Sequence, residues 1–161
     1  MRKEKEEPPT KLSQRAMAEV LEQLTQFAYA GGASKGLRSA QWAALRYFHN
    51  AEDRARTVGS FARYNMTTPS SASQTIETLV NRGFLRRAKV DGDQRSYRLD
   101  LTPSGRRLLA KDPLNLLVDA LSALPAEDQL QFAEHLEKLF QRVLSQVAVS
   151  RGSGKNGKNS P

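Results

Sequence analysis

The strongest constraint on the fold of this chain is a helix-start signal that occurs twice, as Thr68-Pro69 and as Thr102-Pro103. A threonine side chain caps a helix by accepting a backbone hydrogen bond, and proline suits the first helical position because its missing N–H would be unpaired there. The first signal predicts a helix that ends at Asn81-Arg82-Gly83, since glycine readily adopts the left-handed conformation found past helix ends. Its buried face would consist of apolar residues at helical spacing: Ala72, Ile76, Leu79 and Val80.

The segment between the two signals predicts a β-hairpin. Apolar and polar residues alternate in Tyr97-Arg98-Leu99-Asp100-Leu101, and Phe84-Leu85-Arg86-Arg87 is expected to be its partner strand. Asp91-Gly92-Asp93 between them is a strong turn signal. A further short helix is expected at residues 57–64. Two short helices followed by a hairpin are the plan of a winged helix-turn-helix, in which the hairpin is the wing.

The N-terminal part of the chain predicts two more helices. Residues 11–30 place apolar side chains at helical spacing until Gly31-Gly32, and Ser39 is expected to cap the helix that follows. Residues 1–10 are charged and residues 150–161 have no apolar side chain, so neither stretch can offset its ordering entropy by burial. We therefore expect disordered tails at residues 1–10 and 148–161.

Two prolines divide the C-terminal part. Pro113 should kink or break the helix after Thr102-Pro103 near Asp112, and Pro125 should begin a last long helix that extends to residue 147. The terminal helices at 11–30 and 126–147 carry apolar stripes wider than one small winged helix needs to cover. Pairing across a two-fold axis is therefore favoured over packing within one chain, because exposed stripes of this size would cause aggregation.

The positive charge of the chain is concentrated in its middle third. The net charge is +8, and residues 54–107 alone hold 11 basic and 4 acidic side chains, a net charge of +7. A basic excess confined to one module favours a polyanionic partner over an ordinary solvated surface. The length of 161 residues favours one domain.

The helix after Thr68-Pro69 would present polar side chains to a major groove, as the second helix of a helix-turn-helix does. These exposed residues are expected to be Ser70, Ser71, Ser73, Gln74 and Thr75. The amide of Gln74 suits adenine, the hydroxyls suit several bases or phosphates, and no acidic residue comes before Glu77. A simple clustering of Ser and Thr near a helix cap is the alternative.

The wing adds basic side chains to this surface: Arg86, Arg87, Lys89, Arg95 and Arg98. Arg95 could enter a minor groove, where the negative potential of a narrow groove favours arginine. Asp93 could hold its guanidinium through a bidentate pair. The alternative is an ordinary Asp-Gly turn with a surface ion pair of little energetic value.

This pattern resembles the multiple antibiotic resistance regulator (MarR) family. The resemblance rests on Thr68 to Thr75, on Leu79 to Arg87, and above all on Asp93-Gln94-Arg95-Ser96 followed by Leu101-Thr102-Pro103-Ser104-Gly105. The last run is similar to the wing signature of the family, Asp-x-Arg-Ser and then Leu-Thr-Pro-x-Gly into the next helix. The flanking helices match in order and length, so the resemblance covers roughly residues 11–147.

The resemblance implies a mainly α fold with a small β-hairpin wing, in which a DNA-reading lobe at 38–102 is joined to dimerisation helices at 11–30 and 104–147. It implies a homodimer that binds a pseudo-palindromic operator on double-stranded DNA. Two residues depart from the family pattern, because Asn65 replaces an apolar residue and Met66 replaces a turn glycine. Since asparagine tolerates the left-handed conformation, the turn is expected to shift by one residue.

By position, the resemblance assigns DNA contacts to one set of residues: Thr68, Ser70, Ser71, Ser73, Gln74, Thr75, Arg86, Arg87, Lys89, Asp93 and Arg95. Many relatives also hold a small aromatic or phenolic effector between the dimer helices and the DNA-reading lobe. Candidate residues for such a pocket are Tyr29, Trp42, Tyr47, Phe48 and His49. For Trp42 and Phe48 a core position is the favoured interpretation, because aromatic residues at helical spacing are more often core.

The sequence gives little support to other classes of protein. There is no cysteine, the two histidines are far apart in the sequence, and no catalytic or phosphate-loop motif stands out, so we expect no enzyme, metal site or cofactor. No signal peptide or membrane span is visible, and a cytoplasmic, nucleoid-associated regulator is expected. The leading hypothesis is a sequence-specific transcriptional repressor. The alternatives are a nonspecific or architectural DNA-binding protein and a protein-interaction module.

Overall fold

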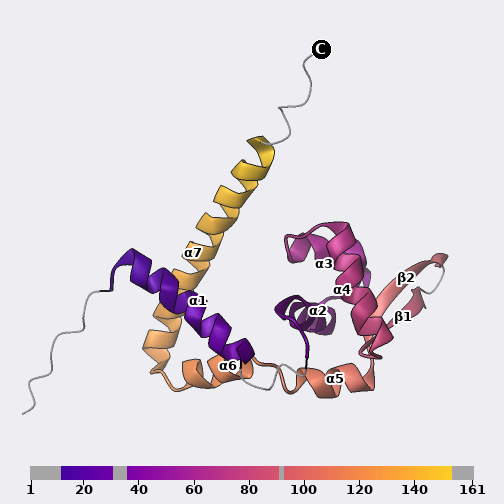
Figure 1. Ribbon diagram of the computed structural model, residues 1–161, viewed down its shortest axis with the longest axis horizontal. Helices are drawn as coiled ribbons and strands as arrows, with labels where there is room; N and C mark the ends of the chain where they lie inside the picture. Colours follow the sequence, from indigo (N-terminus) through magenta and orange to yellow (C-terminus); the bar gives the residue numbers. More distant parts are fainter. Residues whose placement is uncertain (1–11, 31–35, 91–92, 154–161) are drawn as a thin grey trace, which may run out of the picture. The chain divides into compact units, whose positions relative to one another are not determined.

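The computed structural model describes residues 12–30, 36–90 and 93–153, with the side chains of residues 12–30, 36–89 and 97–149. Seven α-helices, one short 3-10 helix and a two-stranded antiparallel hairpin make up this part of the chain (Figure 1). In chain order they are α1 (Gln14–Ala30), α2 (Ser39–Asn50), η2 (Asp53–Ala55), α3 (Val58–Tyr64), α4 (Pro69–Asn81), β1 (Leu85–Val90), β2 (Asp93–Leu101), α5 (Pro103–Leu109), α6 (Asn115–Ser122) and α7 (Ala126–Ser153). The mainly helical winged helix-turn-helix is confirmed.

Both threonine–proline signals begin helices as predicted. The Thr68 hydroxyl accepts a hydrogen bond from the Ser71 N–H at 3.1 Å, and the Thr102 hydroxyl accepts one from the Gly105 N–H at 3.0 Å. Past the end of α4, Gly83 has a φ of +73°, the left-handed conformation expected there. The cap of α2 differs from the prediction. Ser39 is the first helical residue, and the Gln41 side chain accepts a hydrogen bond from the N–H of the preceding residue, Arg38, at 2.8 Å.

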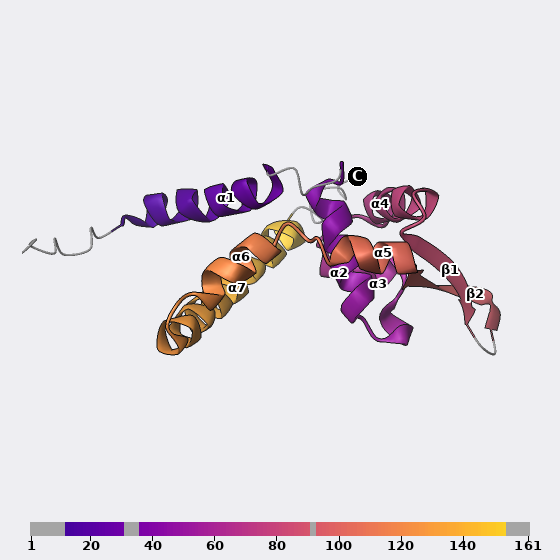
Figure 2. The same cartoon turned by 90° about the horizontal axis from the view of Figure 1, so that it is seen from below.

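One hydrophobic core joins α2, α3, α4, α5 and the hairpin. Its largest fully buried side chains are Trp42, Leu45, Phe48, Phe61, Ile76, Leu79 and Leu85. In the hairpin, Leu85 pairs with Leu101 and Arg86 with Asp100, so one face of the sheet is apolar and the other is charged. The strands project beyond helices α3, α4 and α5 (Figure 2).

Helix α5 is part of this lobe, whereas the family resemblance had assigned residues 104–147 to the dimerisation helices. Leu108 lies in the core, and α5 packs against α2 and β2. Gly105 explains why this packing is close. A Cβ atom at this position would overlap the carbonyl oxygen of Phe84, so only glycine lets α5 lie against the start of the wing.

The chain divides into two compact units, the first ending at Leu116 and the second beginning at Leu117. The length of the chain predicted one domain, and two units arise because the long helix α7 makes mostly local contacts. Helix α7 continues to Ser153, six residues past the predicted end, so residues 148–153 are helical and not a disordered tail. Within the described residues, no helix is long and apolar enough to cross a bilayer.

The turn between α3 and α4 corrects the expected shift at Asn65. Asn65 has a φ of −86°, an ordinary value, whereas Met66 has a φ of +47°. The left-handed residue therefore occupies the glycine position of the family pattern, and the turn does not move. For a residue other than glycine, this left-handed backbone conformation is less stable than the right-handed one by about 1–2 kcal/mol.

Replacing Met66 by glycine is expected to raise the free energy of unfolding by about 1 kcal/mol, because the left-handed backbone no longer carries a Cβ penalty. Chemical denaturation of the purified protein measures this change. Asn65→Gly is the matched control in the same turn, and it should lower the stability, since its φ of −86° gives glycine no advantage. An equal response of the two variants would contradict the strain at Met66.

Candidate nucleic-acid interface

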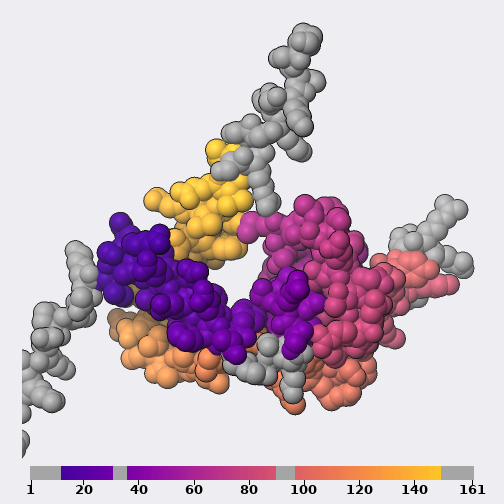
Figure 3. Space-filling model, viewed as in Figure 1, coloured from indigo at the N-terminus to yellow at the C-terminus, as the bar shows by residue number. Residues whose placement is uncertain are grey.

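Helix α4 presents three free polar side chains near its N-terminus. Ser70, Ser73 and Gln74 are exposed, and within the described residues their side chains make no hydrogen bond. Ala72, Ile76 and Leu79 on the opposite side are buried. Helices α3 and α4 both contribute atoms to the molecular surface in the space-filling view (Figure 3). The exposed face of α4 therefore has donors and acceptors available for an external partner.

Three hydroxyls of the predicted set are partly used within the helix. The Thr68 hydroxyl donates a hydrogen bond to the Ser71 hydroxyl at 2.9 Å, and the Thr75 hydroxyl donates one to the Ser71 carbonyl at 3.0 Å. Thr75 is half-buried, whereas Ser71 is exposed. Because these groups have internal partners, Ser70, Ser73 and Gln74 are the better candidates for reading an external ligand.

The wing residues of the predicted set fall into two groups. Arg86 and Lys89 are exposed, and Arg87 makes an ion pair of 2.6 Å with Glu77, which ties the wing to α4. Asp93 and Arg95 belong to β2 by their backbone, but their side chains lie outside the described residues. The proposed pairing of Asp93 with Arg95 stays a prediction.

A second basic feature, which the sequence did not predict, adjoins α4. A groove of about 500 Å³ runs between the N-terminal end of α2 and α4, and Arg38, Gln41, Gln74, Thr78 and Arg82 line it. The Arg82 guanidinium donates a hydrogen bond to the Gly36 carbonyl at 3.1 Å and lies 5.2 Å from the centre of the Phe84 ring. The two arginines could hold a phosphate backbone beside the exposed face of α4. Arg38 and Arg82 are 44 positions apart in the sequence, so no local sequence pattern indicates that they line one groove.

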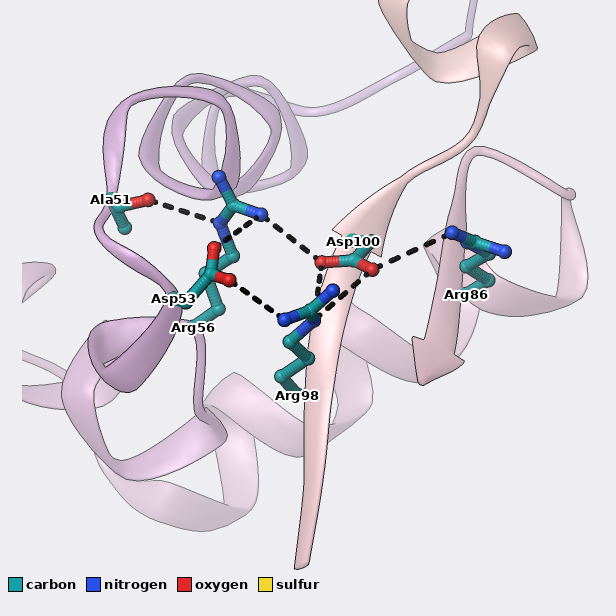
Figure 4. Close-up of polar contacts among 6 residues, drawn as sticks. All are labelled: Ala51, Asp53, Arg56, Arg86, Arg98 and Asp100. Atoms are coloured by element: carbon teal, nitrogen blue, oxygen red, sulfur yellow. Dashed lines mark hydrogen bonds and ion pairs between the residues drawn. The ribbon is translucent and has the colours of Figure 1, made fainter. Parts of the chain in front are cut away.

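The wing is held to the lobe by a buried carboxylate (Figure 4). The Asp100 side chain is 9% exposed, and three arginines surround it: Arg56 at 3.1 Å, Arg98 at 3.3 Å and Arg86 at 3.6 Å. The carboxylate of Asp53 in η2 joins the same network through Arg98 at 2.7 Å and Arg56 at 3.1 Å. We call these five residues the wing joint.

The wing joint links the segment before α3 with both strands of the hairpin. Arg56 lies just before α3 and also donates a hydrogen bond to the Ala51 carbonyl at 3.0 Å, while its own carbonyl accepts one from the Leu99 N–H at 2.9 Å. The remaining members come from η2 and from both strands. Because buried charge-assisted bonds are directional, the joint fixes the angle at which the wing leaves the lobe.

A second ion pair connects the end of α1 with α2 and with the loop after α5. The Arg46 guanidinium bonds both carboxylate oxygens of Asp112, at 2.8 and 2.9 Å, and donates a hydrogen bond to the Tyr29 hydroxyl at 3.0 Å. Burial by itself lowers the pKa of Arg46. Its bonds with Asp112 and Tyr29 raise the pKa by more than burial lowers it, so the net shift is upward. Arg46 therefore stays charged, and no sequence pattern had pointed to it.

The five candidates for an effector pocket have different surroundings. Trp42 and Phe48 are core residues, as their spacing favoured. The Tyr29 hydroxyl bonds Arg46, and the Tyr47 hydroxyl donates a hydrogen bond to the Ala55 carbonyl at 2.8 Å. His49 is exposed and lines two cavities, one of which it shares with Phe48. No described cavity brings the five together. Nor do three or more Asp, Glu or His side chains gather as metal ligands in the part of the chain that the structure describes.

Comparisons with known proteins agree with the fold. Residues 35–96, which contain α2, α3, α4, β1 and the start of β2, match the sequence model of the MarR family. No curated protein sequence matches the chain.

Solved structures of this family share the fold at low sequence identity. A MarR transcriptional regulator from Methanosarcina mazei Go1 superposes with a TM-score of 0.64 at 21% identity, and the match covers 82% of this chain and 99% of that one. S. aureus MepR bound to ethidium bromide gives a TM-score of 0.57 at 18% identity, with 82% and 97% covered. A MepR mutant bound to an oligodeoxyribonucleotide gives 0.55 at 18% identity, with 79% and 94% covered.

Proposed function

Since residues 35–96 carry a MarR-family winged helix-turn-helix, we propose that the chain is a sequence-specific DNA-binding transcriptional regulator, and specifically a homodimeric repressor. The observation that carries the proposal is the free polar face of α4, formed by Ser70, Ser73 and Gln74 in a lobe with a net charge of +7 over residues 54–107. A helix with such a face can enter a major groove, while the surrounding arginines bind phosphates. The oligodeoxyribonucleotide bound to a MepR mutant supports this use of the fold.

Exposed apolar faces on the terminal helices support a dimer. On α1, Met17, Val20, Leu24 and Phe27 are all at least 40% exposed at helical spacing. On α7, Leu136, Leu139, Phe140 and Val143 form a second exposed apolar row. A second copy of the chain would remove both rows from water, and its two-fold axis would repeat α4 at half-sites about one helical turn apart.

Release by a small effector is the finer part of the proposal. MepR, which shares the fold, binds ethidium bromide. In this chain a cavity of about 420 Å³ lies between α2 and the loop after α5, with Arg46, His49, Leu109 and Asp112 in its wall. Its position beside the Arg46–Asp112 pair would let a small aromatic molecule act on the connection between α2 and the segment after α5.

Substitution of Gln74 by alanine is expected to weaken binding to the selected operator by about 10- to 100-fold and to relax the base preference at one position of each half-site, because a bidentate amide contact is lost. Operators are first selected from genomic fragments with the full chain, and affinities are then measured by fluorescence anisotropy. Arg38→Ala should instead weaken all sequences equally and reduce the salt slope by about one unit. Two chains per operator are expected from the mass of the complex.

Arg107→Ala is the matched control for Arg38→Ala, because it also removes one positive charge, here from α5. Among the described residues, the Arg107 side chain bonds only Ser104. Its operator affinity should stay within about threefold of the unmodified protein. A specificity ratio below about a thousand against random duplex would instead favour an architectural DNA-binding protein. Unchanged operator binding by Gln74→Ala would contradict the proposed reading face.

A further inference from the structure

A small polar cavity lies at the base of the wing, outside the reading face of α4. Its volume is about 140 Å³, close to that of a cavity that accommodates one benzene ring. The polar part of its wall consists of His49 in α2, Arg56 before α3, Arg86 and Asp100 in the two strands, and Arg106 in α5. Phe48 and Leu101 form the apolar part of the wall. The cavity therefore has room for a small molecule, and its wall is charged.

The charges around this cavity do not cancel within the protein. The wing joint and Arg106 together hold four arginines and two aspartates, which leaves two positive charges. The Arg106 side chain makes no hydrogen bond or ion pair with any described residue. Arg86 is 66% exposed and reaches Asp100 only at 3.6 Å, a long distance for an ion pair. Of the guanidinium groups that line the cavity, that of Arg106 has no carboxylate partner among the described residues, and that of Arg86 has only the long contact with Asp100.

We infer that this cavity binds a small phosphate-type oxyanion. Planar guanidinium groups bind phosphate through paired N–H donors, and Arg86 and Arg106 would offer such pairs from a strand and from a helix. His49 adds an imidazole that can donate a further hydrogen bond. A dianion would neutralise the two uncompensated charges, which a single carboxylate would not.

The position of the cavity separates it from the DNA-reading face. Arg87 points toward α4, where it bonds Glu77, so the neighbouring Arg86 lies on the opposite face of the hairpin. A duplex held against α4 would therefore not fill the cavity. The oxyanion would be a separate ligand that joins the wing to α2 and α5.

The consequence for DNA binding rests on the proposed function. Arg86 is also one of the predicted DNA contacts, and a guanidinium that closes on an oxyanion in the cavity is withdrawn from a DNA phosphate. The two ligands therefore compete, so each lowers the affinity for the other by the same factor. We expect this factor to be about tenfold.

Inorganic phosphate is the probe for the test, with the full-length protein held at constant ionic strength against chloride. Saturating phosphate should raise the melting temperature by about 3 °C and weaken operator binding by about tenfold. Arg106→Gln should abolish both effects. The matched control Arg107→Gln loses the same charge from the same helix but does not line the cavity, and it should keep both. Phosphate salts stabilise proteins in general, and this effect is the same in both variants. Comparing the phosphate shifts of the two variants therefore isolates the contribution of the cavity.

The outcomes separate this site from the proposed function. A phosphate-specific shift that Arg106→Gln abolishes supports the site even if no operator is found, in which case the regulatory function fails alone. Normal operator binding with identical phosphate shifts in both variants would overturn the site. Loss of operator affinity by Arg106→Gln in chloride, without any phosphate shift in the unmodified protein, would also overturn it, because Arg106 would then contact the DNA backbone.

Discussion

Replacing Asp100 by asparagine should destabilise the protein by about 2–3 kcal/mol and also weaken operator binding. The side chain keeps its shape but loses the charge that faces Arg56, Arg98 and Arg86, which then repel one another around a buried amide. The wing should lose its fixed angle. The variant gains one unit of positive charge, so long-range attraction to DNA alone would raise its affinity. A loss of affinity would therefore be due to the displaced wing and not to the change in charge.

Asp53→Asn is the matched control for this experiment. It makes the same charge change and touches two of the same arginines, but the Asp53 side chain is 64% exposed. Its stability should fall by less than about 1 kcal/mol, and its operator affinity should stay equal or rise slightly. Urea denaturation and anisotropy titrations measure the two quantities. If Asp100→Asn bound the operator more tightly than Asp53→Asn, the wing joint would not position the wing.

Substitution of Gly105 by alanine is expected to cost about 3 kcal/mol and to lower the melting temperature by about 10 °C. The added methyl would overlap the backbone carbonyl oxygen of Phe84, which cannot rotate away as a side chain could. That carbonyl also accepts a hydrogen bond from the Thr102 N–H at 3.1 Å. The substitution would therefore force α5 away from the start of β1.

Gly59→Ala is the control for helix propensity. Gly59 lies in α3, and the nearest atom to an added Cβ is the tip of Arg63 at 3.9 Å, an ordinary contact. Alanine should stabilise the protein there by about 0.5–1 kcal/mol, since it favours helix more than glycine does. Calorimetry of both variants gives the comparison. Similar melting temperatures for the two would show that α5 can move away from Phe84 at little cost.

Gly105 and Asp100 both determine how the wing is attached to the rest of the lobe. Gly105 sets how closely α5 approaches the start of β1, and Asp100 sets how β2 is tied to the segment before α3. A regulator that reads DNA with a helix and a wing needs both elements at a fixed distance. The cavity lined by Arg86 and Arg106 lies between these attachments, so the proposed oxyanion would act on the wing without touching α4.

Local features were predictable from sequence because their causes lie within a few residues. The caps at Thr68 and Thr102 and the left-handed Gly83 each depend on backbone groups at most three positions away. The polar face of α4 follows from the helical period, and the hairpin follows from its alternation and turn. At Met66 the same local reasoning was wrong, because it weighed only the tolerance of asparagine and not the geometry that α3 and α4 impose on the turn.

Sequence alone therefore determined the element order, the winged helix-turn-helix and the polar face of α4, all of which rest on short-range hydrogen bonds and periodicity. Only the tertiary structure decided which charges meet. Arg56 and Asp100 are 44 positions apart, and Arg46 and Asp112 are 66 apart, so neither pair leaves a local pattern. Such pairs form only after the hydrophobic core has brought distant segments together, because an ion pair by itself does not repay the entropy of closing so long a loop.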